Sequence, residues 1–268
     1  FTIKTNVLGT ANVLNSVKDL KKEVTAVIIT SDKCYDNLEL KRGYNEKDLL
    51  GGKDIYSGSK GAAELIIKSF YNSFFKNHKY QSTIVSARAG NVIGGGDWGK
   101  DRIVPDAVAS WNKNEKLSIR NPLSTRPWQH VLEPISGYLT LASKLYLDKK
   151  LNGENFNFGP DETSNKTVKD LIDRLSKRWG FKEKKDSYSI KHIEDFHEAG
   201  LLQLDCTKAN NVLDWKPNLS FDQMINLSAD WYKEFYNTKD IEGMVIASEN
   251  QIKNYIEIAK EKNYSWTK

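Results

Sequence analysis

Tyr56 and Lys60, four residues apart, are the first candidates for acid–base chemistry in this chain. Positions i and i+4 of a helix lie on one face, so the phenol and the ammonium would stand side by side. A neighbouring ammonium lowers the pKa of a phenol and makes it a usable base near neutral pH. The same spacing recurs at Tyr146/Lys150 and at Tyr264/Lys268. Because only Tyr56 opens a long predicted helix between two predicted strands, we favour the Tyr56/Lys60 pair.

A second group of reactive side chains follows a short apolar run at 23–30. Thr30 and Ser31 bring hydroxyls, Asp32 a carboxylate and Lys33 an amine. Ser and Asp are also common in plain turns, so this string alone allows either reading. Ligands of parallel α/β sheets bind beyond the carboxyl ends of the strands, which is where this string falls. Together with the Tyr/Lys pair on the next helix, it indicates a site.

A glycine-rich segment after the second predicted strand fits two phosphate-binding patterns. Gly94–Gly99 matches G-x-G-x-x-G, and Gly94–Lys100 matches the first seven positions of G-x-x-x-x-G-K-[ST]. Such loops hold phosphate on backbone N–H groups at a helix N-terminus. Here Asp97 would lie inside the cradle and repel the phosphate, and Asp101 replaces the magnesium-binding hydroxyl. We therefore disfavour both patterns.

Apolar periodicity alternates between strand and helix along the whole chain. We expect helices at 3–20, 56–76, 103–111, 134–149, 167–179 and 221–235, strands at 23–30, 81–87, 117–119 and 155–158, and a polar loop at 31–54. Leu65, Ile66 and Phe70 are expected on the apolar side of the helix 56–76, and a charged helical tail from residue 237 is expected at the periphery. This alternation predicts an α/β fold with a mostly parallel sheet.

Composition excludes several classes of protein. The 268 residues carry a formal net charge of +5, and the basic residues are spread in pairs, which gives no case for nucleic-acid binding. The apolar run at 24–30 is far shorter than the ~20 residues of a membrane span. The two cysteines, Cys34 and Cys206, form no CxxC motif and exclude a disulfide scaffold. We expect a cytoplasmic protein without a metal site.

Five strings in the sequence carry a family resemblance. They are residues 6–10 (NVLGT), 31–37 (SDKCYDN), 88–98 (RAGNVIGGGDW), 126–134 (RPWQHVLEP) and 197–205 (HEAGLLQLD). With the order strand, Ser/Thr, Tyr-x-x-x-Lys and strand, the chain resembles an extended short-chain dehydrogenase/reductase of the nucleotide-sugar dehydratase and epimerase branch. The longer strings are similar to those of the CDP-glucose 4,6-dehydratases.

The resemblance implies a Rossmann-type doubly wound parallel sheet with a smaller C-terminal α/β part. Residues 1–90 would form the C-terminal portion of the NAD-binding domain. Residues 91–268 would mainly bind the nucleotide-sugar, with some segments returning to the Rossmann sheet. The family opens with a strand and a glycine turn for the NAD pyrophosphate, whereas this sequence begins at Phe1 in what reads as the middle of a helix. We therefore expect an N-terminally truncated chain that by itself is inactive and binds NAD weakly.

The activity that the resemblance implies is that of a lyase, which converts CDP-glucose to CDP-4-keto-6-deoxyglucose while NAD is reduced and reoxidised. Tyr56 would take the proton of the C4 hydroxyl, Lys60 would hold the nicotinamide ribose, and Ser31 would bond the C4 oxygen. Asp32 would protonate the hydroxyl that leaves C6. Related dehydratases carry Glu as the C5 base, where this chain has Lys33. Either Lys33 acts as a neutral amine or the base lies elsewhere.

Further ligands follow from the same resemblance. Thr30 and Ala89 would contact NAD together with Tyr56 and Lys60. Asn91 and Arg126 are similar to the family's ligands for the sugar-nucleotide diphosphate, to which an arginine offers a bidentate fork. Asp205 would meet the nucleotide ribose, and Arg88 would be either a substrate ligand or a structural residue.

Other conspicuous side chains are expected to have structural roles. We expect His130 to be a hydrogen-bonded core histidine. The three tryptophans near turns are expected to fill space rather than bind ligands; they are Trp98, Trp128 and Trp215.

The resemblance also implies partners and a pathway. It implies a homodimer or higher homo-oligomer built on the helices that start near Phe1 and Tyr56, and no membrane partner. The pathway would be deoxysugar synthesis for a surface polysaccharide such as the lipopolysaccharide O-antigen. Two alternatives stay open: another nucleotide-sugar dehydratase or epimerase of the same superfamily, or a non-catalytic fragment.

Overall fold

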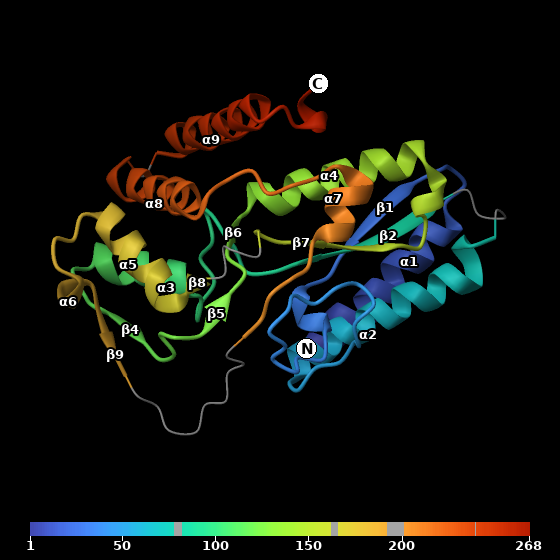
Figure 1. Cartoon of the computed structure of the whole chain (residues 1–268), viewed down its shortest axis with the longest axis horizontal. Coiled ribbons are helices and arrows are strands. Elements are labelled where there is room, and N and C mark those ends of the chain that lie inside the picture. Colours follow the sequence, from blue (N-terminus) through green and yellow to red (C-terminus); the bar gives the residue numbers. More distant parts are fainter. Residues whose placement is uncertain (78–81, 162–165, 192–200, 239) are drawn as a thin grey trace. The chain divides into compact units, whose positions relative to one another are not determined.

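The computed structural model describes residues 1–77, 82–161, 166–191, 201–238 and 240–268 (Figure 1). The chain divides into two compact units, each built from three separate stretches. Unit 1 comprises Phe1–Gly90, Pro134–Glu162 and Leu202–Lys216, and unit 2 comprises Asn91–Glu133, Thr163–Leu201 and Pro217–Lys268. Part of the family string at 197–205, residues 197–200, lies outside the described residues.

A three-stranded parallel sheet forms the centre of unit 1. Its strands are β1 (Thr25–Ile29), β2 (Thr83–Ala89) and β7 (Asn155–Phe158), in the order β1-β2-β7. Every residue of the central strand β2 is buried. A strand covered on both faces is usually apolar throughout, and β2 departs from that pattern at the buried polar residues Ser86 and Arg88.

Helices cover both faces of this sheet. Figure 1 shows α1 (Gly9–Asp19) and α2 (Ile55–Phe70) on one face and α4 (Leu132–Leu147) and α7 (Thr207–Leu213) on the other. Side chains of β2 alternate between the two cores: Ile84 packs with Leu14 and Ile67, while Val85 packs with Leu141. The predicted doubly wound α/β class is confirmed.

Two helices of unit 1 have an adjoining π turn that the periodicity did not predict. The turns are η1 (Lys4–Leu8), which precedes α1, and η3 (Tyr71–Phe75), which follows α2. The expected apolar side of α2 is partly wrong, since Leu65 is 55% exposed while Ala63 and Glu64 are buried.

Unit 2 is built around its own apolar core. The helices α3 (Ile103–Asn112), α5 (Val168–Trp179) and α8 (Phe221–Thr238) enclose it, with residues such as Trp111, Leu171 and Met224 at its centre. Three short strand pairs complete it: parallel β3 (Val92–Ile93) with β6 (Gln129–His130), parallel β4 (Leu117–Ile119) with β9 (Tyr188–Ile190), and antiparallel β5 (Thr125–Arg126) with β8 (Lys166–Thr167). The remaining short helices are η2 (Asp32–Cys34) and η4 (Lys149–Leu151) in unit 1 and α6 (Lys184–Ser187) and η6 (Ser265–Thr267) in unit 2.

The charged C-terminal tail is less peripheral than its composition predicts. It forms α9 (Ile241–Glu261), which packs on α8 and buries Met244, Tyr255 and Ala259. The Tyr255 hydroxyl donates to the buried carboxylate of Glu133 at 2.8 Å, and that carboxylate also accepts from the backbone N–H of Asn218. The single tyrosine of α9 thus anchors the helix through a buried hydrogen bond.

The loop at 31–54 also differs from the expected polar segment. Its Cys34, Tyr35 and Tyr44 are buried with Leu202 and Leu204 in a small core of their own. The rings of Tyr35 and Tyr44 stack with centroids 5.4 Å apart. The loop is therefore a packed part of unit 1, and this packing fixes the residues that follow β1.

Trp98, Trp128 and Trp215 all have packing roles, as expected. Trp128 and Trp215 are buried, and Trp98 contacts the aromatic side chains of α8. Within the described ranges, no helix is both long and apolar enough to cross a membrane.

Leu141→Ala tests the core of unit 1. Leu141 is fully buried on α4, so the truncation removes packing on the sheet and is expected to lower the free energy of unfolding by about 2–5 kcal/mol. Leu139 on the same helix is 67% exposed, and Leu139→Ala should change stability by less than about 0.5 kcal/mol. Urea denaturation of both variants makes the comparison. Equal losses would show that α4 does not cover the sheet as described.

Candidate active site

The residues after β1 form a tight turn that presents their polar groups. Ser31 is extended (φ −166°), and its Oγ accepts from the backbone N–H of Lys33 at 3.2 Å and so caps η2. The same hydroxyl donates to Asp32 Oδ1 at 2.9 Å. Asp32 is 2% exposed, whereas Ser31 and Lys33 are partly exposed. A hydroxyl and a carboxylate are therefore coupled at the carboxyl end of this strand.

Tyr56 and Lys60 lie at the start of α2, where the carboxylate of Asp54 caps the helix. Asp54 Oδ1 accepts from the backbone N–H groups of Tyr56 and Ser57 at 2.9 and 3.0 Å. The Tyr56 side chain is about half exposed, and Lys60 Nζ lies 5.8 Å from the centroid of its ring. The predicted adjacency of the two side chains is present, while their catalytic roles remain predictions.

The electrostatic environment of Lys60 comes from three sources. Burial lowers the pKa of its ammonium, while the neighbouring Cys34 and Glu64 act in the opposite direction. Burial also raises the pKa of the Cys34 thiol, so that thiol is neutral near physiological pH. Glu64, one turn further along α2, is then the anion that favours the charged form of Lys60.

A glycine lets α2 approach the turn after β1 closely. A Cβ on Gly61 would lie 2.8 Å from the carbonyl oxygen of Gly51 and 3.3 Å from that of Cys34. Both contacts are too short for an ordinary side chain. Gly61 therefore allows α2 to pack directly against η2, which brings the two groups of candidate residues into one unit.

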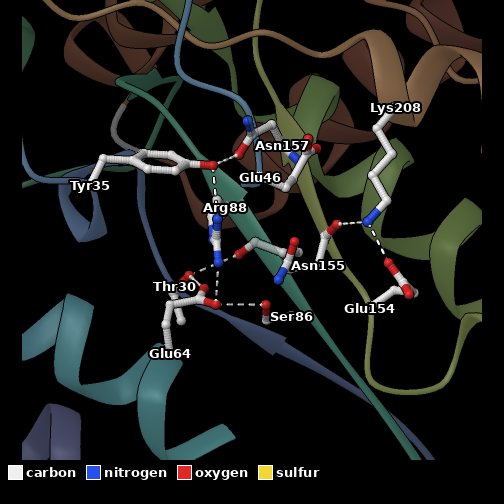
Figure 2. A network of polar contacts seen from close by, with 11 residues as sticks. Thr30, Tyr35, Glu46, Glu64, Ser86, Arg88, Glu154, Asn155, Asn157 and Lys208 are labelled. Carbon is white, nitrogen blue, oxygen red and sulfur yellow. Dashed lines mark hydrogen bonds and ion pairs between the residues drawn. The ribbon is translucent and has the colours of Figure 1, made fainter. Parts of the chain in front are cut away.

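A buried polar network lies beneath these groups (Figure 2). Glu64 Oε2 accepts from Arg88 Nη2 at 2.7 Å and from Ser86 Oγ at 2.9 Å, and Glu64 Oε1 accepts from the hydroxyl of Thr30. Arg88 Nη1 donates to the Tyr35 hydroxyl at 2.8 Å. The carboxylate thus joins α2 to the ends of β1 and β2.

This network bears on Arg88, for which the sequence left two roles open. Arg88 is 1% exposed, and its guanidinium binds Glu64 and Tyr35. Of the two roles expected for Arg88, substrate ligand or structural residue, this geometry favours the structural one. Glu64 was missed because a charged residue on a helix is normally read as solvated; the only signal was its place on the buried face, between Ala63 and Ile67.

Two further predicted residues lie in unit 1. Ala89 is the last residue of β2 and is 7% exposed. Asp205 is partly exposed, and its Oδ1 accepts from the backbone N–H of Thr207 at 2.9 Å, at the start of α7. Its backbone N–H donates to the Tyr44 carbonyl, which ties it to the loop after β1. Their roles toward NAD and the nucleotide ribose remain predictions.

The predicted diphosphate ligands lie in unit 2. Asn91 precedes β3, and its carbonyl accepts from the backbone N–H of Gln129 at 3.0 Å. Arg126 on β5 is 3% exposed, and its Nη1 donates to the Thr125 carbonyl at 2.8 Å. Unit 2 thus holds both residues at strand ends, and their binding roles remain predictions.

His130 on β6 is a buried histidine, 2% exposed. Its Nδ1 accepts from the backbone N–H of Leu132 at 3.4 Å, which assigns the ring proton to Nε2. Among the described residues, Nε2 has no hydrogen-bond partner. Burial lowers the pKa of His130 to about 4, so the imidazole is neutral at physiological pH.

The glycine-rich segment is not arranged as a phosphate loop. The carboxylate of Asp97 accepts from the backbone N–H of Gly99 at 3.0 Å and pairs with Arg102 at 2.9 Å. The segment therefore binds the carboxylate of its own Asp97 rather than a phosphate. Gly95 is required because Trp231 lies against it, 2.1 Å from where a Cβ would be.

The other two Tyr-x-x-x-Lys matches do not place both residues in one helix. Tyr146 lies near the end of α4 and Lys150 in the separate helix η4, and Tyr264 and Lys268 flank η6. Over the described ranges, no group of three or more His, Cys, Asp or Glu side chains could hold a metal ion.

A Tyr-x-x-x-Lys pair on a helix of a doubly wound α/β unit is typical of the short-chain dehydrogenases/reductases, a class that includes the nucleotide-sugar dehydratases and epimerases. The family model for GDP-mannose 4,6 dehydratase matches residues 1–227, and the chain belongs to this family. The chain is 43% identical over 258 residues to the CDP-glucose 4,6-dehydratase of Salmonella typhimurium, covering 95% of this chain and 70% of that protein.

Solved structures agree with this membership. The dTDP-glucose 4,6-dehydratase of Bacillus anthracis in complex with NAD is 25% identical with a TM-score of 0.73, covering 90% of this chain and 71% of that one. The UDP-glucuronic acid 4-epimerase of Bacillus cereus has the same fold, with 21% identity, a TM-score of 0.73 and coverage of 87% and 69%.

The buried imidazole of His130 predicts a pH dependence of stability. Its ordinary pKa of 6.5 falls to about 4 on folding, so the unfolded chain takes up a proton between these values that the folded chain refuses. The contribution of His130 to the free energy of unfolding should therefore be complete above pH 6.5. As the pH falls to 4, the free energy of unfolding should decrease by about 3 kcal/mol.

His130→Asn keeps an acceptor in place of Nδ1 and removes the titrating group. Urea denaturation of both proteins between pH 4 and 6.5 should give a flatter dependence for the variant. The comparison is of slopes, because the substitution also changes packing. Identical slopes would contradict the neutral buried imidazole.

Proposed function

We propose that this protein dehydrates CDP-glucose to CDP-4-keto-6-deoxyglucose with the help of NAD. The observation that carries the proposal is the coupling of Ser31 to the buried Asp32 beside the Tyr56/Lys60 helix. Epimerisation needs a base and a hydroxyl, but removal of water also needs an acid for the leaving group. The 43% identity to a CDP-glucose 4,6-dehydratase supports the choice of substrate.

The ends of β1 and β2 fit a dinucleotide. The carboxyl ends of adjacent parallel strands are where such cofactors bind; the small residue Thr30 directly follows β1, and Ala89 ends β2. The Lys60 ammonium lies beside the Tyr56 ring, and its N–H donors suit ribose hydroxyls. NAD, when bound, supplies the acceptor for the C4 hydride and returns that hydride to C6.

Oxidation at C4 assigns roles to three side chains. Tyr56 removes the proton of the C4 hydroxyl as the C4–H bond breaks. With substrate bound, the Ser31 hydroxyl exchanges its hydrogen bond to Asp32 for one that it donates to the same oxygen. Lys60, beside the Tyr56 ring, favours the phenolate by its positive charge and binds ribose hydroxyls. The C4 ketone then acidifies the hydrogen on C5.

Elimination assigns roles to the next two residues. Asp32 donates a proton to the C6 hydroxyl, which leaves as water, while a base removes the C5 proton. Either Lys33, which follows directly on the chain, serves as that base as an uncharged amine, or the base lies elsewhere. After hydride returns to C6, the same base reprotonates C5.

Tyr56→Phe and Asp32→Asn should slow different steps in the full-length protein. Each removes a general acid–base group, so kcat should fall by about 10²–10⁴-fold. Asp32→Asn leaves oxidation possible and should accumulate a sugar nucleotide that has lost two hydrogens but no water. Tyr56→Phe should accumulate none. Rapid-quench mass spectrometry distinguishes the two.

The parent enzyme decides the proposed function itself. If it inverts a sugar hydroxyl without losing water, an epimerase replaces the dehydratase. If Asp32→Asn still releases 6-deoxy product at the parental rate, another group is the acid.

Arg126→Ala tests diphosphate binding. Loss of a charge-assisted hydrogen bond should weaken the binding of CDP by about 1.5–3 kcal/mol, measured by calorimetry on the full-length protein. Arg126→Lys keeps the charge but loses the fork and should recover only part of the affinity. Arg120→Ala, at a half-exposed arginine of the same unit, is the control and should leave binding in place. Unchanged CDP affinity in Arg126→Ala would place the diphosphate elsewhere.

A further inference from the structure

The carboxylate of Glu64 is buried where α2, the end of β1 and β2 meet. It lies on α2, one turn after Lys60, and is 4% exposed. It accepts from Thr30, the residue before Ser31 and Asp32, and from Ser86 and Arg88 on β2. Figure 2 shows the carboxylate with these partners around it.

We propose that Glu64 is the positioning residue of the active site, which holds the Tyr56/Lys60 turn of α2 in register with the Ser31–Asp32 turn after β1. The inference rests on the proposed function, because it assigns Glu64 a part in the same reaction. Glu64 does not itself touch the substrate; it acts through Thr30 and Lys60.

Hydrogen bonds to β2 restrict how the Tyr56/Lys60 turn of α2 and the Ser31–Asp32 turn after β1 can be aligned. The Thr30 backbone N–H is held by the Ala87 carbonyl of β2 at 2.8 Å, so the strand end is fixed to the sheet. The helix is fixed to the same place by Glu64, through both of its oxygens. A shift of α2 along its axis would have to break the ion pair with Arg88, and a buried unpaired charge is strongly unfavourable.

The negative charge of Glu64 also favours the charged form of Lys60. The groups that act on Lys60 are Tyr56, whose ring centroid is 5.8 Å from Nζ, Glu64 on the same helix and Cys34 on η2. Cys34 is neutral, as its pKa is raised by burial. Removing the negative charge of Glu64 leaves Arg88 uncompensated, which disfavours the ammonium of Lys60 and favours the phenolate of Tyr56.

Two substitutions of Glu64 in the full-length protein separate the effect of the length of its side chain from the effect of its charge. Glu64→Asp keeps the charge but shortens the side chain by one methylene. It should lower kcat by about 10- to 100-fold, with little change in KM for CDP-glucose and an unmoved pH profile. Glu64→Gln keeps the length but removes the charge, and both limbs of its pH–kcat profile should move to lower pH.

Two further variants complete the test. Glu64→Gln with Arg88→Met removes one charge of each sign and should return the profile toward its parental position. Glu154→Gln is the matched control, because Glu154 also forms an ion pair in unit 1, with Lys208, but is half exposed. It should leave kcat, KM and the pH profile unchanged. Thermal unfolding of every variant reports the structural cost separately.

Parental kcat in Glu64→Asp, or an unmoved pH profile in Glu64→Gln, would overturn the proposal. A loss of thermal stability with parental kinetics would leave Glu64 as a structural residue only, and would also overturn it. If Glu64→Gln does not fold, Glu64→Asp and the double variant decide by the same criteria. An inactive parent enzyme would instead contradict the proposed function, which keeps the two failures distinct.

Discussion

The ion pair between Glu64 and Arg88 is the interaction on which the organisation of unit 1 depends. Their side chains are only 3% and 2% exposed, and removing such charges from water costs several kcal/mol for each. This cost is offset only where geometry and additional hydrogen bonds are favourable. Thr30, Ser86 and Tyr35 supply those bonds here. The helix and the two strands are therefore fixed relative to one another by polar contacts rather than by apolar packing alone.

The same network reaches the loop and the last helix of unit 1. Tyr35, which accepts from Arg88, donates to Asn157 Oδ1 at 2.7 Å. Asn157 Nδ2 then donates to the carbonyls of Tyr44 and Asp205, and Asn157 is fully buried. One amide on β7 thus orders both the loop after β1 and the segment before α7. A continuous set of hydrogen bonds links the candidate NAD-binding strand ends to the candidate ribose ligand Asp205.

Much of the fold could be predicted because its elements carry a period. The strands predicted at 23–30 and 81–87 and the helices predicted at 103–111 and 167–179 coincide with the observed elements to within a few residues. The pair Tyr56/Lys60 could be predicted for the same reason, since it needs only local geometry. The π turns at Lys4–Leu8 and Tyr71–Phe75 could not, because composition does not distinguish them from α-helix.

What escaped prediction depends on partners far away in sequence. Glu64 is buried only because Arg88 lies opposite, and Tyr255 is buried only because Glu133 accepts its hydroxyl. A polar residue with a remote partner has the same sequence signature as a solvated one. The packed loop at 31–54 follows the same rule, since its core needs Leu202 and Leu204. Periodicity indicates which face of a helix or strand is buried, whereas the burial of these residues depends on a partner that is remote in sequence.

The interleaving of the two units has a consequence for synthesis on the ribosome. The core on one face of β2 includes Phe156, Leu213 and Trp215, which are translated long after β2 itself. Unit 1 cannot close until all of unit 2 up to residue 201 has been made, because its last stretch begins at Leu202. Such non-local contacts slow folding and leave apolar surface exposed meanwhile. Part of the apolar surface of β2 therefore stays uncovered until α7 has been synthesised.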